Sequence, residues 1–348
     1  MVRAIEWLDV PRPTIRLIDQ TLLPETERYV DITTVDVLVE AIGDLVVRGA
    51  PALGSAGALG VALAMVQAVD ERWDTERLGT EIDRIRDARP TAVNLAWGVN
   101  QVRGSMDRGT AEVLRLALQV LAEDEAANRE LSRRGADWVL AHVERQEVRV
   151  ITHCNTGALA TSGWGTAYGI IHELHNRGRL GLVYADETRP LLQGARLTSW
   201  ELLHDGIKHV VQADSAAAST ILRGLVDVAI IGADRIAANG DTANKVGSVG
   251  LALACQRAGI PFVVAAPSST VDLSIKRGED IAIEERHEDE VLGFAGVRTT
   301  PTGVRGFNPA FDVTPHDLIN AVITELGIVE TASQVHPELL AIVAHPAR

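Results

Sequence analysis

Val148-Arg-Val-Ile-Thr-His-Cys-Asn-Thr-Gly157 decides the fold of this chain. Its first five residues form a short apolar strand, and a helical pattern follows at Ser162–His175. Regular alternation of this kind indicates an α/β fold with a right-handed, mostly parallel, doubly wound sheet. The alternation continues with strands at Leu182–Asp186, His209–Gln212, Val226–Ile231 and Pro261–Ala266, and with helices at Leu191–His204, Ala216–Leu225 and Asn244–Ala258.

Reactive and small polar side chains follow the ends of these strands. Cys154, Glu187, Asp234 and the stretch Pro267–Thr270 each come directly after one of them. Ligands of doubly wound sheets bind beyond the carboxyl ends of the strands, where the strand order reverses. We therefore expect these residues to converge on one crevice if their strands are neighbours.

The sequence before Val148 predicts a different architecture. It has short strands bounded by prolines, which we expect to form a small antiparallel sheet, and then helical patterns. We predict an N-terminal, mainly helical domain at residues 1–125 and a Rossmann-like domain at residues 126–348, with the boundary inside a long helix. The strands are Ala4–Leu8, Thr14–Asp19 and Glu27–Ile32, and the helices are Val35–Val47, one opened by Pro51, Thr91–Met106 and Thr110–Val143.

Composition excludes several classes of protein. The net charge of −14 argues against a nucleic-acid-binding surface. Two cysteines in 348 residues argue against a disulfide framework, and Cys255 fits a small buried hydrophobe in a helix. The N-terminus has no signal-peptide pattern. The uncharged stretch Ala50–Val69 is mostly Ala and Gly, which favours a close-packed buried helix over a membrane span. We expect a cytoplasmic protein.

Cys154 has a functional and a structural interpretation. As a thiolate it could act as a base or nucleophile, since a helix start after the strand would lower the pKa of its thiol. A cysteine buried at a strand end for packing alone is the commoner case. The pattern argues against a zinc site, because His153 and Cys154 are adjacent, point to opposite faces of a strand, and have no second cysteine nearby.

Asp234 ends the strongly apolar strand Val228–Ala233, where partial desolvation would raise its pKa towards that of a general acid. The alternative is a turn or helix cap, a common role of aspartate. Asp241 competes for that role, because Asn239-Gly240 is typical of a turn. The segment then leads to a helix expected to start at Asn244, where an anion could bind.

Three cations precede expected helix starts: Arg48 before Gly49-Ala50-Pro51, Arg89 before Pro90, and Lys245 beside Asn244. Guanidinium groups and exposed helix N–H groups bind phosphate well, so we expect a small phosphorylated ligand. A C-cap glycine beside an ordinary surface charge explains the first of these equally well. Arg189, Gln193 and Arg196 allow the same two interpretations, with Gln193 pointing into the crevice or all three lying on a solvated polar face.

The glycines Gly163, Gly165 and Gly169 form a weak alternative, a dinucleotide fingerprint with Asp186 at the end of the second strand. They begin about ten residues after the first strand rather than in its immediate turn. Packing of a helix against the sheet explains them better.

Together these motifs closely resemble the S-methyl-5-thioribose-1-phosphate isomerase family, aldose–ketose isomerases of methionine salvage. The wider superfamily also holds ribose-1,5-bisphosphate isomerases and non-catalytic regulatory subunits of the eukaryotic exchange factor for translation initiation. Intact motifs around Cys154 and Asp234 resemble those of the enzymes. The matching segments span nearly the whole chain: Arg48–Pro51, Arg89–Leu95, Thr152–Gly157, Glu187–Thr198, Gly232–Ile236, Asn239–Lys245 and Asn308–Pro315.

The resemblance implies the activity and the roles at the site. Asp234 would act as general acid or base at the sugar oxygens, and Cys154 would act at C2, as a proton-transfer base or by stabilising the transition state. Transfer of a proton and transfer of a hydride both stay open. No metal or organic cofactor is implied, and a homodimer is. The substrate-binding positions implied by the resemblance are Arg48, Gly49, Ala50, Arg89, Gln193, Asn244 and Lys245.

Two departures from the family pattern bear on the substrate. Ser248 stands where threonine is expected, and Phe307 stands where tyrosine is usual. Neither is in the acid–base pair. Alternative substrates are therefore 5-deoxyribose 1-phosphate and ribose 1,5-bisphosphate, and a non-catalytic regulatory subunit is the third interpretation.

Overall fold

A computed structural model describes residues 2–89, 93–331 and 340–341. The chain forms two compact units. Unit 1 consists of Met1–Arg129 and Thr156–Gly165, and unit 2 of Glu130–Asn155 and Thr166–Arg348. The first passage between them falls inside helix α5 (Thr110–His142).

Unit 1 begins with the small antiparallel sheet that the sequence predicts. Its strands are β1 (Ile5–Leu8), β2 (Thr14–Ile18) and β3 (Tyr29–Ile32), in the order β1-β2-β3. The apolar residues Ile15 and Leu17 of β2 are buried, and β2 pairs with both other strands. The sheet therefore contributes its central strand to the core of unit 1.

The helices of unit 1 pack into the same core. Helix α1 ends at Gly43 and not at Val47 as predicted, because Leu45 adopts a left-handed backbone with φ of 64°. Helix α3 was not predicted: only Ile82 and Ile85 in it are fully buried, so its apolar signal is weak. Residues 90–92, where a helix start was predicted at Thr91, lie outside the described part. The helices are α1 (Val35–Gly43), α2 (Ala50–Glu71), α3 (Thr75–Arg86) and α4 (Val93–Arg103), followed by α5.

Helix α2 is the uncharged Ala- and Gly-rich segment. By length and composition it could cross a membrane, but 78% of its most apolar 18-residue window is buried inside the protein. It packs on α4 so closely that a Cβ atom on Gly98 would lie 1.9 Å from the carbonyl oxygen of Gly54. The prediction of a close-packed buried helix is confirmed.

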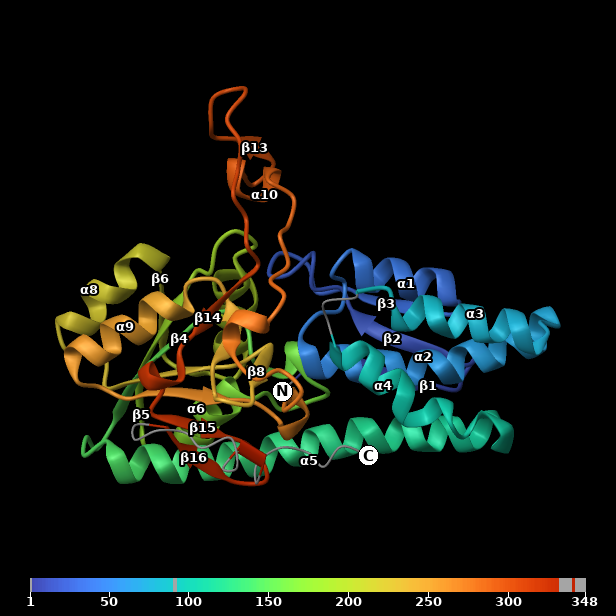
Figure 1. The fold of residues 1–348 in the computed structure, drawn as a ribbon, viewed down its shortest axis with the longest axis horizontal. Coiled ribbons are helices and arrows are strands. Elements are labelled where there is room, and N and C mark those ends of the chain that lie inside the picture. Colours follow the sequence, from blue (N-terminus) through green and yellow to red (C-terminus); the bar gives the residue numbers. More distant parts are fainter. Residues whose placement is uncertain (1, 90–92, 332–339, 342–348) are drawn as a thin grey trace. The chain divides into compact units, whose positions relative to one another are not determined.

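Unit 2 is built on a seven-stranded sheet with the order β16-β15-β10-β7-β4-β5-β6 (Figure 1). All neighbours in it run parallel except β15 and β16. From β4 the chain adds β5 and β6 on one side, then returns to add β7, β10 and β15 on the other. The order therefore reverses between β4 and β7, as in a doubly wound fold. The strands are β4 (Val148–Thr152), β5 (Leu180–Asp186), β6 (His209–Gln212), β7 (Val228–Ile231), β10 (Phe262–Ala265), β15 (Ala321–Ile323) and β16 (Ile328–Glu330).

Helices cover both faces of this sheet (Figure 1). In β7, Val228 and Ile230 pack on the face with the C-terminal part of α5, α6 (Ala167–Asn176) and α7 (Ser199–His204). Their neighbours Ala229 and Ile231 pack on the face with α8 (Ala217–Leu222) and α9 (Ser248–Ala258). This alternation is the two-residue period of a strand that is buried on both sides.

Three predicted helices differ from the structure at their starts. The helix predicted from Ser162 begins at Ala167, so Gly163 and Gly165 lie in an irregular segment and helix packing does not explain them. The helix predicted from Leu191 consists of a π-helical turn, Gly194–Thr198, followed by α7. The helix predicted from Asn244 begins at Ser248, because the preceding residues form a strand.

That strand belongs to a second sheet, which the sequence did not predict. Its order is β11-β8-β9-β14, with β11 (Val271–Asp272), β8 (Arg235–Ala237), β9 (Thr242–Lys245) and β14 (Phe311–Thr314). Residues 284–310 form an arm that extends away from the two sheets of unit 2 (Figure 1). The arm carries α10 (Asp289–Leu292), β12 (Gly293–Phe294) and β13 (Val297–Arg298), and a bridge between Glu285 and Pro309 closes its base.

Candidate active site

Cys154 follows β4 in a strained backbone conformation. Its φ of 65° lies in the left-handed region, which is unfavourable by about 1 kcal/mol or more for a residue other than glycine. Hydroxyl groups hold it on both sides: its N–H donates to Thr188 Oγ1 at 2.8 Å, and its carbonyl oxygen accepts from Thr198 Oγ1 at 2.6 Å. Thr188 is itself left-handed, with φ of 63°. The segment after β5 therefore fixes the backbone of Cys154 and with it the direction of its Cα–Cβ bond.

The helix start expected to lower the pKa of this thiol is not there. The chain after Cys154 forms a single 3-10 turn, Ala158–Ala160, and the next α-helix starts at Ala167. A helix dipole acts mainly over its first turn, so α6 does not explain a reactive thiol.

Asp234 follows β7, the strand beside β4. Cys154 and Asp234 therefore follow the two strands that flank the reversal of strand order. Asp234 is half-buried, and its N–H donates to the carbonyl oxygen of Ala243 at 2.9 Å, which sets it beside Asn244 on β9.

Asp241 takes the turn-forming role that was the alternative for Asp234. Residues 235–245 form a β-hairpin, β8 and β9, with its turn at Asn239-Gly240 as predicted. The carboxylate of Asp241 accepts hydrogen bonds from Asn239, from the N–H of Gly278 and from His316. Burial would raise the pKa of Asp241, but these hydrogen bonds outweigh it and lower the pKa below its usual value.

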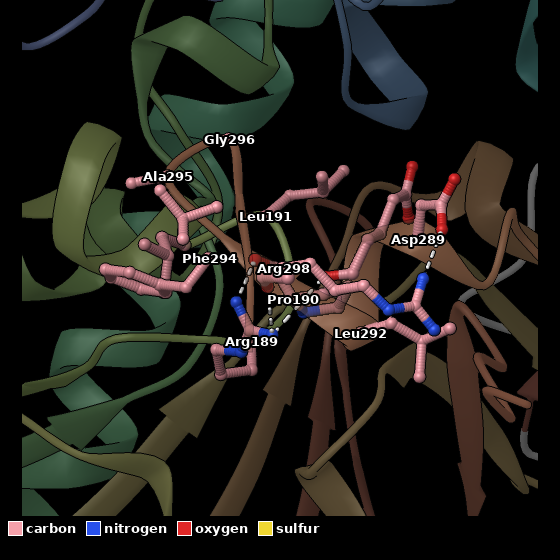
Figure 2. A pocket seen from close by; sticks show the side chains of 13 residues that line it. Arg189, Pro190, Leu191, Asp289, Leu292, Phe294, Ala295, Gly296 and Arg298 are labelled. Atoms are coloured by element: carbon pink, nitrogen blue, oxygen red, sulfur yellow. Dashed lines mark hydrogen bonds and ion pairs between the residues drawn. The ribbon is translucent and has the colours of Figure 1, made fainter. Parts of the chain in front are cut away.

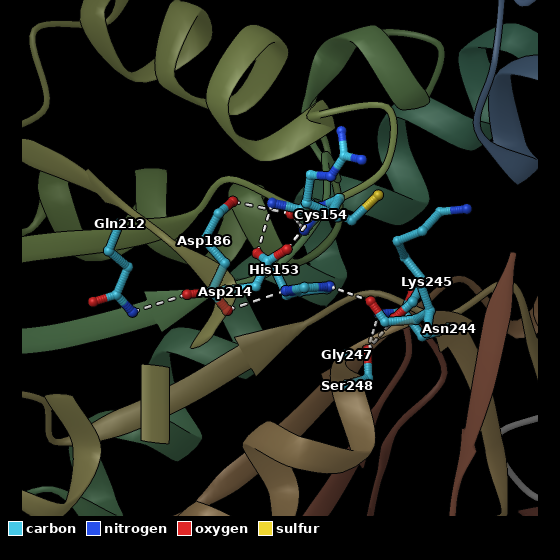
Figure 3. Close-up of polar contacts among 12 residues, drawn as sticks. His153, Cys154, Asp186, Gln212, Asp214, Asn244, Lys245, Gly247 and Ser248 are labelled. Atoms are coloured by element: carbon cyan, nitrogen blue, oxygen red, sulfur yellow. Dashed lines mark hydrogen bonds and ion pairs between the residues drawn. The ribbon is translucent and has the colours of Figure 1, made fainter. Parts of the chain in front are cut away.

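Asn244 and Lys245 lie at the end of β9, so the prediction that they open a helix is wrong. β9 pairs antiparallel with β14, and Gly247 is the N-cap of α9. Asn244 Nδ2 donates to Ser248 Oγ at 2.9 Å, and the Lys245 ammonium lies 4.6 Å from the centre of the Phe311 ring. Figure 3 shows the Lys245 side chain and the Cys154 thiol extending towards the same side of this region.

Gln193 lies in the loop after β5 and is buried in unit 2, where it is 5% exposed. Its Oε1 has no hydrogen-bond partner among the residues that the structure describes. A buried amide oxygen without a donor is unfavourable by about 1–3 kcal/mol, which a ligand hydroxyl or N–H would relieve. The loop packs tightly here, since a Cβ atom on Gly194 would lie 1.7 Å from the carbonyl oxygen of Asp186.

The sequence allowed two interpretations of Arg189, a position in the crevice or one on a solvated face. The structure shows neither. The Arg189 guanidinium donates to the carbonyl oxygens of Glu290 and Val291 in α10 and of Gly293 in β12, which all lie on the arm. Figure 2 shows Arg189 among the residues that line a pocket of about 500 Å³ between this loop and the arm. Arg196 donates to the carbonyl oxygen of Leu191 within its own loop.

The sequence gives no signal for the environment of His153, because the partners of its side chain are distant in the chain. Its Nδ1 lies 3.0 Å from Asp186 Oδ2 and its Nε2 lies 2.8 Å from the carbonyl oxygen of Val246 (Figure 3). Asp214 completes a group whose ligand atoms lie within 4.8 Å of one another. Its two carboxylate oxygens accept the N–H groups of Thr188 and Arg189. Because the ring nitrogens and the carboxylate oxygens of these three residues already have hydrogen-bond partners, the three residues fit a shared proton better than a metal ion.

The remaining predicted site residues, Arg48, Gly49, Ala50 and Arg89, belong to unit 1. Gly49 is the N-cap of α2 with φ of 95°, and Ala50 is its first residue, so the predicted helix start is confirmed. Only glycine fits at position 49, because a Cβ atom there would lie 2.4 Å from the carbonyl oxygen of Ala160. Arg48 and Arg89 are half-buried in this unit.

The glycines of the weak dinucleotide fingerprint serve local packing instead. Gly165 has φ of 99°, and a Cβ atom on it would lie 2.7 Å from the Cα atom of Gly157. It lies in the segment Thr156–Gly165 that belongs to unit 1, and not in a turn that directly follows β4.

Known proteins resemble this chain over nearly its whole length. The model of the initiation factor 2 subunit family matches residues 46–331. A probable bifunctional methylthioribose-1-phosphate isomerase/methylthioribulose-1-phosphate dehydratase from Nocardia farcinica is 50% identical over 96% of the chain, which spans 60% of that protein's length. The methylthioribose-1-phosphate isomerase of Gloeobacter violaceus is 46% identical, with 94% of this chain and 93% of that protein covered.

Two solved structures share the fold over similar lengths. The 5-methylthioribose 1-phosphate isomerase from Pyrococcus horikoshii OT3 has a TM-score of 0.86 and 38% identity, covering 95% of this chain and 93% of that one. The translation initiation factor eIF-2B, subunit delta, from A. fulgidus has a TM-score of 0.84 and 37% identity, covering 98% of this chain and all of that one.

Proposed function

Because the chain belongs to the initiation factor 2 subunit family, and relatives that match it over nearly their full length carry the name methylthioribose-1-phosphate isomerase, we propose that it is such an enzyme. It converts S-methyl-5-thio-α-D-ribose 1-phosphate to S-methyl-5-thio-D-ribulose 1-phosphate in methionine salvage. The observation that carries the proposal is the position of Cys154 and Asp234 after β4 and β7, on either side of the strand-order reversal.

The reaction needs groups of these two kinds. The phosphate on C1 prevents the sugar from opening to a free aldehyde, so the ring must open while the hydrogen of C2 moves to C1. The C2 hydroxyl becomes a carbonyl and the ring oxygen gains a proton. Asp234 transfers protons at the sugar oxygens, and Cys154 acts at C2, as base or by stabilising the transition state. An apolar site that excludes water favours transfer of either a proton or a hydride.

Substrate binding falls to Arg48, Gly49, Ala50, Arg89, Gln193, Asn244 and Lys245. The arginines and Lys245 supply positive charge for the phosphate, and the buried Oε1 of Gln193 supplies an acceptor for a sugar hydroxyl. The chemistry as written uses side chains and substrate alone, without a cofactor. The protein acts in the cytoplasm as a homodimer.

Two other functions compete. A related isomerase of 5-deoxyribose 1-phosphate or ribose 1,5-bisphosphate would use the same groups and differ at the C5 substituent. A regulatory subunit of translation initiation is favoured by the resemblance to the A. fulgidus structure. The presence of both Cys154 and Asp234 after the flanking strands supports the enzyme.

The test is a turnover assay on the three sugar phosphates with the wild type, Cys154→Ser and Asp234→Asn. Loss of general acid–base catalysis lowers rates by about 10²–10⁴, so we expect kcat to fall by that factor in each variant. Cys255→Ser is the matched control, because Cys255 is buried in α9, where burial raises the pKa of its thiol to about 12. It should keep wild-type kcat.

Wild-type kcat in both site variants would contradict the site assignment. Preference for a bisphosphate would contradict the substrate, and absence of turnover on all three sugar phosphates would favour the regulatory subunit.

A further inference from the structure

His153 connects two parts of unit 2 that carry the proposed site residues. It directly precedes Cys154, and its side chain is 1% exposed. One ring nitrogen contacts Asp186 at the end of β5, and the other contacts Val246, which follows Lys245 in the turn between β9 and α9 (Figure 3). The ring therefore links the end of β4 to the turn that bears Asn244 and Lys245.

Both contacts require N–H groups on the ring. The carbonyl oxygen of Val246 can only accept, so Nε2 carries a hydrogen. An ionised Asp186 carboxylate also only accepts, so its contact with Nδ1 needs a second proton. Asp186 Oδ1 accepts from Gln212 Nε2 at 2.8 Å, which leaves Oδ2 to the imidazole.

The surrounding charges place that proton on the ring. Burial alone would lower the pKa of His153, but the hydrogen bond and charge of Asp186, and the charge of Asp214, raise it above its usual value. Burial also raises the pKa of Asp186, against the effect of His153. The pKa values of His153 and Asp186 are both raised, although the contact between them holds only one proton. We assign it to His153, because the hydrogen bond from Gln212 favours the ionised Asp186 carboxylate and the carbonyl oxygen of Val246 favours the protonated ring.

The turn is shaped to receive the ring. Gly247 has φ of 112°, and a Cβ atom on it would lie 2.8 Å from Cε1 and 3.0 Å from Nε2 of His153. Real Cβ contacts are not this short, so a side chain at position 247 would displace the imidazole.

The same turn holds the side chain of Asn244. Ser248 Oγ accepts from Asn244 Nδ2 at 2.9 Å and donates to the carbonyl oxygen of Lys245 at 2.8 Å. A shift of the turn therefore moves both residues that the proposed function assigns to substrate.

We propose that His153 is a positioning residue: hydrogen bonds from its two ring nitrogens fix Cys154 relative to Asn244 and Lys245. This inference rests on the proposed function, because the isomerase reaction is the one that His153 would support. His153 itself does not touch the substrate in this role. It acts through the backbone of its neighbour and of Val246.

Two substitutions separate its hydrogen bonds. His153→Asn keeps a donor near the position of Nδ1 and loses the bond to Val246, while His153→Gln keeps a donor near the position of Nε2. We expect His153→Asn to raise KM roughly ten- to hundredfold, the range for loss of a charged hydrogen bond. His153→Gln keeps the bond to Val246 and so the link to the turn, and it should raise KM less than His153→Asn does. Gly247→Ala, which displaces the ring without changing it, should raise KM in the same direction.

Tyr168→Phe is the control for a structural effect. It removes a partly buried hydrogen bond of 2.7 Å to Asp205 in the same unit. It should lower Tm and leave KM unchanged. If His153→Asn, His153→Gln and Gly247→Ala lower Tm but change KM no more than Tyr168→Phe does, His153 is merely structural and the proposal is wrong.

Nitrogen-15 NMR of the wild type with labelled histidine tests the link without substrate. We expect the His153 ring to carry hydrogens on both nitrogens at pH 7, and an unprotonated Nε2 would overturn the proposal. Because this measurement needs no turnover, it distinguishes failure of the His153 link from failure of the proposed function.

Discussion

At the scale of single residues, the backbone conformation of unit 1 restricts which side chains fit at particular positions. Gly49 has φ of 95° and lies against Ala160, so an added methyl group meets both strain and overlap. We expect Gly49→Ala to reduce the free energy of unfolding by about 1–3 kcal/mol. Gly43→Ala is the control, because Gly43 is helical and has no atom within 4 Å of an added Cβ.

Urea unfolding followed by circular dichroism measures both variants. Gly43→Ala should be neutral or stabilising by up to about 1 kcal/mol, since alanine favours the helix. Equal stability of Gly49→Ala and the wild type would show that the backbone of unit 1 can adjust at this position.

Sequence located Cys154 and Asp234 because each follows an apolar strand, a signal that lies within a few residues. It could not reveal the role of His153, since its partners Asp186 and Val246 are 33 and 93 positions away. It also left Arg189 undecided, because its carbonyl partners lie about a hundred residues further along the chain.

At the scale of elements, Asp227 ties β4 to β7 at their amino ends. Its carboxylate accepts two bonds from the Arg149 guanidinium and one from the Arg149 N–H, and its side chain is 13% exposed. Burial would raise the pKa of Asp227, but the bonds and charge of Arg149 lower it below its usual value. We expect Asp227→Asn to reduce the free energy of unfolding by about 1–3 kcal/mol at pH 7.

The effect of this substitution depends on pH in a defined direction. Since the folded pKa of Asp227 is lowered, its stabilisation is present above the ordinary pKa of about 3.9 and is lost as pH falls through the folded value. The difference from wild type should therefore shrink below about pH 4. Asp31→Asn, at the exposed pair with Arg16, should change stability little at either pH. A constant difference for Asp227→Asn across pH would contradict the ionic origin.

The element that sequence misassigned is β9. The sequence pattern predicts a helix from Asn244, but β14, about seventy residues later, pairs with Thr242–Lys245 along its whole length. Local propensity does not include so distant a partner, and tertiary pairing overrides it. β7 and β10 were predicted to within two residues of their observed bounds, because all four residues of each are buried and apolar. β15 and β16, of three residues each, were not predicted.

At the scale of the whole molecule, assembly is the property to measure. The proposed homodimer predicts a sedimenting species of twice the 37.3-kDa chain mass at micromolar concentration. Analytical ultracentrifugation across a hundredfold range of concentration measures this directly. A single species of one chain mass throughout would contradict the dimer.

The order of strands comes from the structure, whereas the doubly wound class of the sheet followed from the alternation of strands and helices in the sequence. The second sheet and the arm did not, since their strands are two to four residues long and carry almost no periodic signal. The predicted domain boundary at residues 125 and 126 stays a prediction.

The close contact of α2 with α4 has a consequence during synthesis. Gly54 leaves the ribosome before Gly98, whose backbone it must meet, and at 5–20 residues per second the interval is roughly two to nine seconds. Throughout that time the nascent chain presents an uncharged segment that resembles a membrane span in length and composition. Chaperones and membrane-targeting factors therefore have access to this segment before α4 can pack on it.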